Sequence, residues 1–122
     1  MTKIETYIVD YFNDKHFKGN PAGVCILNQK MTDEGMQSIA KELGLSETAF
    51  VTLIDKPSKY SIRYFSPIME IPLCGHATLA SSKVLFEINP IMTDIHFKNI
   101  QNLDLILENY ILNLMLIYYQ KY

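Results

Sequence analysis

MEIPLCGHATLASSKVLFE, residues 69–87, is the segment on which the predicted fold depends. After the apolar MEIPL, a Cys74-Gly75-His76 turn opens a helical pattern that ends at Asn89-Pro90, because proline cannot continue a helix. Ala77 and Ala80 are small, so this helix can lie close against a sheet. The segment therefore predicts a helix at the centre of the domain.

The residues on either side of this helix show strand patterns and one further helix. Thr32 is a suitable N-cap, and Gly44 supplies a stop after apolar residues at helical spacing. The expected strands are residues 4–12, 24–27, 47–54 and 59–66, followed by three short strands within 94–118, broken near Asn102 and Asn109. The fold class predicted is α+β, with a curved mixed sheet wrapped around the central helix.

The composition fits one packed domain, with 48% hydrophobic and 20% charged side chains among 122 residues. The net charge of −2 comes without long runs of either sign, so we expect no nucleic-acid partner and no membrane binding. Asp104 and Glu108 interrupt the last apolar stretch, which is too short for a membrane span. The N-terminus lacks a signal-peptide pattern, and Cys25 and Cys74 form no paired motif, which predicts a reduced, cytoplasmic location and no metal site. No phosphate loop, nucleophile elbow or dinucleotide fingerprint occurs, so no cofactor is expected.

Glu47 is the first candidate for chemistry. It starts the strand SETAFV on the same face as Ala49 and Val51. A carboxylate at the rim of an apolar face is partly desolvated, which suits it to proton transfer near neutral pH. A solvated glutamate at a strand end is the alternative.

The Cys74-Gly75-His76 turn is the second candidate. Backbone N–H groups at a helix start carry partial positive charge and can hold a carboxylate, and Gly75 permits close approach. His76 can donate or accept a proton near neutral pH, although a cap or packing role is the alternative. Cys74 can act as a thiol base or as a buried structural cysteine. Asn20, in a Gly-Asn-Pro turn, offers an amide to a polar substrate, and a plain tight turn is equally consistent.

Four segments in series carry a family resemblance: DYFNDKHFKGNPAGVCIL, GLSETAF, IRYFSP and EIPLCGHATLASSKVLF. In order and approximate spacing they resemble the PhzF-like family of phenazine biosynthesis proteins, over residues 4 to about 90. Residues 91–108 match loosely, and residues 109–122 do not match. The resemblance implies a fold similar to diaminopimelate epimerase, in which two pseudo-symmetric α/β lobes flank the active site. Residues 1–122 are then expected to form a single N-terminal lobe.

The resemblance further implies a cofactor-independent isomerase that transfers a proton on a small carboxylic acid. Glu47 matches the family's catalytic glutamate, a general acid/base. His76 is implied as a second catalytic residue that assists proton transfer or orients the substrate, and the helix start at Gly75 receives the substrate carboxylate. Asn20 and Cys74 are placed among the substrate-binding residues, and with Glu47 present we expect a structural role for the Cys74 thiol.

The family's second lobe, which supplies a catalytic aspartate, has no match in this chain. One hypothesis is a homodimer, in which a second copy substitutes for that lobe. The alternative is a truncated, catalytically inactive lobe that acts as a binding module. Two features bear on truncation: all five glycines lie in the first 75 residues, and the last 24 residues are rich in Ile, Leu, Asn and Tyr.

Overall fold

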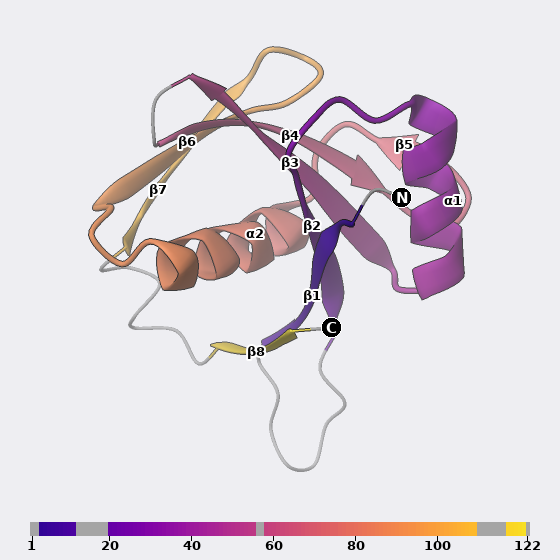
Figure 1. Ribbon diagram of the computed structural model, residues 1–122, viewed down its shortest axis with the longest axis horizontal. Coiled ribbons are helices and arrows are strands. Elements are labelled where there is room, and N and C mark those ends of the chain that lie inside the picture. Colours follow the sequence, from indigo (N-terminus) through magenta and orange to yellow (C-terminus); the bar gives the residue numbers. More distant parts are fainter. Residues whose placement is uncertain (1–2, 12–19, 56–57, 110–116, 122) are drawn as a thin grey trace.

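A computed structural model of the chain describes residues 3–11, 20–55, 58–109 and 117–121. Within these ranges the chain forms one mixed sheet and two helices (Figure 1). The helices are α1 (Asp33–Leu43) and α2 (Gly75–Ile88). The strands are β1 (Glu5–Tyr11), β2 (Ala22–Leu27), β3 (Glu47–Asp55), β4 (Lys59–Phe65), β5 (Glu70–Ile71), β6 (Asp94–Lys98), β7 (Asp104–Glu108) and β8 (Ile117–Lys121). The predicted α+β class is confirmed.

The topology of the sheet explains where the two helices lie. The strand order is β7-β6-β4-β3-β2-β1-β8, and β5 pairs with β4. β2 with β3 and β4 with β6 are parallel pairs, connected through α1 and α2 respectively. In both pairs the second strand lies on the same side of the first, towards β7 in the strand order. The two pairs run in opposite directions, because β4 is antiparallel to β3. Because such crossovers are right-handed, the two helices lie on opposite faces, as Figure 1 shows.

α2 lies inside the curve of the sheet and forms the larger core with it (Figure 1). Two of its buried polar residues, Ser81 and Ser82, each donate to a backbone carbonyl one turn earlier at 2.8 Å, so their hydroxyl groups can be buried. The prediction of a central helix is therefore confirmed. The buried apolar residues of this core are Tyr7, Val9, Ala22, Val24, Ala49, Val51, Ile62, Tyr64, Ala77, Ala80, Val84, Leu85, Phe86, Ile95 and Phe97.

α1 covers the opposite face with a smaller core. Its predicted bounds are confirmed: Thr32 Oγ1 accepts a hydrogen bond from Gly35 N at 3.0 Å, and Gly44 ends the helix with a φ of 68°. A positive φ of this size favours glycine over any side chain with a Cβ. The buried residues of this second core are Cys25, Leu27, Met36, Ala40, Phe50 and Phe65.

The expected three short strands after α2 are present in part. β6 and β7 lie within the predicted segment, and Asn102, in the turn between them, has a φ of 62°. β8 pairs with β1, and residues 110–116 lie outside the described residues. Neither α1 nor α2 is both long enough and apolar enough to cross a bilayer.

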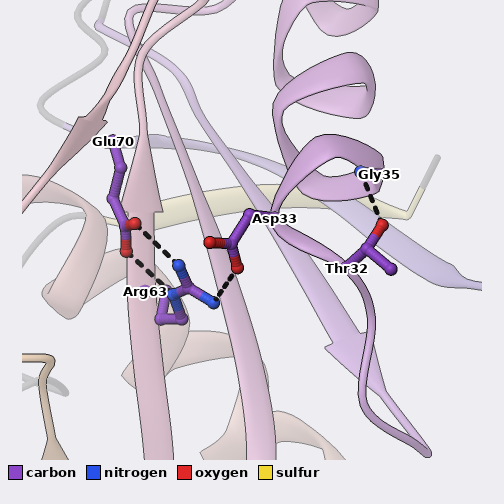
Figure 2. Close-up of polar contacts among 5 residues, drawn as sticks. All are labelled: Thr32, Asp33, Gly35, Arg63 and Glu70. Carbon is purple, nitrogen blue, oxygen red and sulfur yellow. Dashed lines mark hydrogen bonds and ion pairs between the residues drawn. The ribbon is translucent and has the colours of Figure 1, made fainter.

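Arg63 connects three elements on the α1 side of the sheet (Figure 2). From β4, its Nε and Nη2 atoms donate to the two carboxylate oxygens of Glu70 in β5, at 2.8 and 2.7 Å. Its Nη1 atom donates to Asp33 Oδ1, at the start of α1, at 2.9 Å. The hydrogen bonds to Glu70 are the largest cause of a raised pKa for Arg63. The guanidinium thereby holds β5, which is separated from α2 by residues 72–74 only.

Replacing Arg63 with methionine is expected to lower the free energy of unfolding by about 1–3 kcal/mol, because two carboxylates lose charge-assisted hydrogen bonds. Urea unfolding measures this difference. Lys83→Met is the matched control, since it removes an i,i+4 pair with Glu87 on α2 and should cost about 0.5 kcal/mol or less. Equal losses in the two variants would contradict a special role for the Arg63 cluster.

Candidate active site

The candidate site lies at the end of the sheet where α2 begins. Glu47, the first residue of β3, is paired with Ala22 at the start of β2. Asn20 lies two residues before Ala22. Cys74 is the N-cap of α2. The topology thus brings together the five residues singled out in the sequence, which come from three separate segments: Asn20, Glu47, Cys74, Gly75 and His76.

The ring of His76 is held by the backbone of Asn20. His76 Nε2 is in hydrogen-bond contact with the carbonyl oxygen of Asn20, across 56 residues of sequence. A carbonyl oxygen can only accept, so Nε2 carries the hydrogen in this contact. In the neutral ring Nδ1 is then the basic nitrogen. Asn20 therefore contacts His76 through its backbone carbonyl, and this contact orients the His76 ring.

Glu47 has a buried oxygen that forms no hydrogen bond with any described residue. The residue lies on the α2 side of β3, in line with the fully buried Ala49 and Val51. Its Oε2 atom is buried, and no described residue donates to it. Burying a carboxylate oxygen without a donor is costly, so such a group in a folded protein calls for an explanation. One explanation is that this oxygen accepts a proton from a bound molecule.

Cys74 and Gly75 form the start of α2. Cys74 Sγ accepts from Ala77 N at 3.5 Å, and Cys74 O accepts from Thr78 N at 3.0 Å. Burial raises the pKa of the Cys74 thiol, and the nearby Glu47 carboxylate raises it further. A thiol kept neutral in this way is a weak nucleophile and serves here as a cap.

The space in front of Gly75 is open. Gly75 is exposed, and apart from its own turn of helix no described residue would lie within 4 Å of a Cβ built on it. α2 has no acidic residue in its first turn, so no carboxylate of the helix itself neutralises its N-terminal amides. An anionic group can therefore approach this backbone directly.

The segment that precedes Cys74 is held by Asn99, in the turn between β6 and β7. Asn99 is buried, and its Nδ2 atom donates to Pro72 O at 2.9 Å. Its Oδ1 atom accepts from the backbone N of Gln101 and of Leu103, at 3.0 and 2.9 Å. Both the amide nitrogen and the amide oxygen of Asn99 are thus hydrogen-bonded. The side chain joins two loops near the site, the segment before Cys74 and the turn between β6 and β7.

Sequence reasoning missed the pair Tyr64 and Thr78. Tyr64 is fully buried in β4, and its Oη lies 2.5 Å from Thr78 Oγ1. Thr78 Oγ1 donates to Cys74 O at 2.8 Å. Two signals were available. Tyr64 stands two residues after Ile62 and shares the inward face of its strand, and Thr78 stands four residues after the N-cap, the spacing for a bond to the carbonyl of that residue.

Cys25 and His96 lie away from the candidate site. Cys25 is fully buried against α1, and burial raises its pKa to about 11. His96 contacts Asp94 at 3.3 Å on β6, and His16 lies outside the described residues. In the parts of the chain that the structure describes, no three His, Cys, Asp or Glu side chains group in a way that could hold a metal ion.

The chain is an α+β protein in which a curved mixed sheet surrounds one helix, with a carboxylate and a histidine near the start of that helix. The comparison with solved structures agrees. A phenazine biosynthesis PhzC/PhzF protein of Clostridium difficile superposes with a TM-score of 0.75 and 45% identity, over 87% of this chain and 40% of that one. A predicted epimerase of Pseudomonas aeruginosa shares the fold with a TM-score of 0.64 and 24% identity, over 78% of this chain and 34% of that one.

The sequence profile of the PhzC-PhzF family, described as phenazine biosynthesis-like proteins, matches residues 9–100. The chain belongs to this family. An uncharacterised isomerase of Halalkalibacterium halodurans is 49% identical over 94 residues, 77% of this chain and 35% of that protein. A phenazine biosynthesis-like domain-containing protein of Bos taurus is 48% identical over 90 residues, 69% of this chain and 31% of that protein. The chain thus spans about a third of the length of the curated relatives it matches.

Proposed function

We propose that this chain is one lobe of a cofactor-independent isomerase that moves a proton on a small carboxylic acid, with Glu47 as general acid/base. The observation that carries the proposal is the buried, unpartnered Oε2 atom of Glu47, close to the N-terminus of α2. An acceptor to which no described residue donates, with a positive helix end beside it, suits a substrate that is both acidic and anionic. Membership of a family with named isomerases supports the same class of reaction.

In the proposed reaction the Glu47 carboxylate removes a proton from an activated C–H bond. The electron pair left on that carbon is delocalised into the conjugated carboxylic acid of the substrate. Protonated Glu47 then returns the proton to a different carbon, so the product is an isomer and no group is gained or lost. His76, oriented by the carbonyl of Asn20, assists the transfer or orients the substrate.

The substrate carboxylate is placed at Gly75. Its exposed backbone gives an anion access to the first amides of α2, and the missing Cβ leaves room for it. Asn20 and Cys74 would border the bound molecule, Cys74 as a neutral thiol. Binding of the carboxylate here would bring the adjoining carbon atoms towards Glu47.

A second copy of the chain is the partner that we propose for this lobe. The described residues form one sheet with its two helices, which supports treating residues 1–122 as a single lobe. Near the site, the two loops joined by Asn99 carry three apolar side chains that are about half exposed: Leu73, Ile100 and Leu103. Exposed apolar residues beside an open site suit an interface, and two-fold symmetry would place two such lobes face to face.

Deuterium incorporation from D₂O tests the function. A panel of small unsaturated and hydroxy-substituted carboxylic acids is incubated with the chain, and C–H exchange is followed by NMR. We expect exchange into at least one acid, and dependence of that exchange on Glu47. Equilibrium binding of the acids without exchange would instead identify a binding module and overturn the isomerase proposal.

Sedimentation velocity tests the proposed partner separately. A dimer is expected at micromolar concentration, and Leu103→Glu should shift it towards monomer by placing a charge in the interface. A strictly monomeric wild-type chain would contradict the dimer.

A further inference from the structure

The buried hydrogen bonds beneath the start of α2 run in one direction. Thr78 Oγ1 lies 2.8 Å from Cys74 O and 2.5 Å from Tyr64 Oη. A carbonyl oxygen only accepts, so the single hydroxyl hydrogen of Thr78 is used on Cys74. Tyr64 must then donate to Thr78. The chain of bonds therefore leads from Tyr64 through Thr78 to the carbonyl of the helix cap.

Both hydroxyl groups are removed from water. Tyr64 is 0% exposed and Thr78 is 5% exposed. Burial raises the pKa of Tyr64 to about 12, so the phenol keeps the hydrogen that it donates. A hydrogen-bond chain inside a protein is stronger than one in water, because the local dielectric constant is lower. The two groups are thus suited to hold one backbone conformation.

The carbonyl that they hold belongs to the peptide between Cys74 and Gly75. Rotation of that peptide would redirect the Gly75 amide and move the first turn of α2, including His76. Two further contacts depend on the same turn: Ala77 N donates to Cys74 Sγ, and His76 Nε2 contacts Asn20 O. A hydrogen bond to the Cys74 carbonyl therefore restrains the orientation of the whole first turn of α2.

We propose that Tyr64 and Thr78 are positioning residues, which hold the Cys74–Gly75 peptide so that the start of α2 and His76 face the Glu47 carboxylate. For catalysis the inference rests on the proposed function. Its structural content, that Tyr64 restrains the turn, stands on the geometry alone. Neither residue touches the substrate; each acts through the backbone of Cys74.

Amide hydrogen exchange measured by NMR tests the restraint without any substrate. In Tyr64→Phe, exchange at Ala77 and Thr78 is expected to become about fivefold faster, the factor that corresponds to loss of one buried hydrogen bond. Amides of Val24 in β2 and Val51 in β3, which are fully buried in the middle of the sheet, serve as the internal reference for global unfolding. Tyr60→Phe is the matched control, because it removes a phenol from the same face of β4 at the other end of the strand.

Variants of Thr78 separate the hydroxyl bond from mere packing. Thr78→Val keeps the shape but lacks the hydroxyl, and it should speed exchange at Ala77 at least as much as Tyr64→Phe does. Thr78→Ser retains the hydroxyl and should restore slow exchange. Adding Tyr64→Phe to Thr78→Val should have little further effect, since the two groups act through one chain of bonds.

The outcomes distinguish the two proposals. If Tyr64→Phe leaves exchange at Ala77 and Thr78 within twofold of Tyr60→Phe, or if the two single effects are additive, the positioning role is wrong. If wild-type chain incorporates no deuterium into any acid, the proposed function is wrong, and the amide measurements still decide the role of Tyr64. If both hold, the rate of deuterium incorporation should fall about fivefold in Tyr64→Phe and Thr78→Val and recover in Thr78→Ser.

Discussion

Replacing Glu47 with glutamine is expected to lower the rate of deuterium incorporation by about 10²- to 10⁴-fold, the range typical of losing a general acid/base. The amide has nearly the shape of the carboxylate but cannot take up the substrate proton. Measurement of initial exchange rates at saturating substrate gives the effect on the chemical step.

The same substitution should leave the free energy of unfolding unchanged or slightly higher. The Oε2 atom of Glu47 is buried and receives no hydrogen bond from the part of the chain that the structure describes, and a neutral amide at this place is less costly to desolvate than a carboxylate. Such a combination, lost activity with retained stability, is typical of a residue that serves function rather than folding. Urea unfolding and the exchange assay are carried out on the same preparation.

Two further variants complete this test. Glu42→Gln changes an exposed glutamate of α1 and should affect neither measurement. Glu47→Asp keeps the charge but withdraws the carboxylate by one methylene, and a displacement of about 1 Å can cost about 10²-fold in rate. Exchange that survives in Glu47→Gln at the wild-type rate would eliminate Glu47 as the acid/base.

Replacing Phe50 with alanine is expected to lower the free energy of unfolding by about 3–5 kcal/mol, the usual range for truncating a buried phenylalanine. Phe50 is 1% exposed in the core under α1, and its ring meets that of Phe65 edge to face, with centroids 5.5 Å apart. This core is small, so few neighbours can move into the space left behind. A loss of this size is a large part of the roughly 5–15 kcal/mol that stabilises an ordinary domain.

Leu53→Ala is the matched control for this prediction. Leu53 lies on the same strand, three residues further on, and is 54% exposed. Its truncation should cost less than about 1 kcal/mol. Urea unfolding of both variants measures the difference, and similar losses would mean that the α1 core contributes little to stability.

Local signals in the sequence predicted the elements of the fold. Thr32 and Gly44 predicted both ends of α1, because a side-chain cap and a left-handed stop act within one turn of the helix. The small residues of α2 predicted its close approach to the sheet. The strands predicted at residues 47–54 and 59–66 correspond to β3 and β4, which pair antiparallel.

Pairing between distant strands could not be predicted in the same way. In each of the parallel pairs β2–β3 and β4–β6, a whole helix separates the two strands in the sequence. No residue pattern within either strand specifies its partner. The end of the sheet at which α2 starts depends on these pairings. The sequence offered Asn20, Glu47 and His76 as separate candidates, and the topology decides that they lie together.

By itself, then, the sequence determined the class of the fold, the bounds of both helices, the family, and a set of residues with suitable chemistry. Each of these depends on local propensity or on the identity of side chains along the chain. Only the tertiary structure decided that Glu47 has a buried oxygen without a donor, that His76 is held by a carbonyl, and that Tyr64 reaches the cap of α2 through Thr78. The reason is physical: burial and hydrogen-bond partners are properties of the space around an atom, and here that space is formed by segments far apart in the chain.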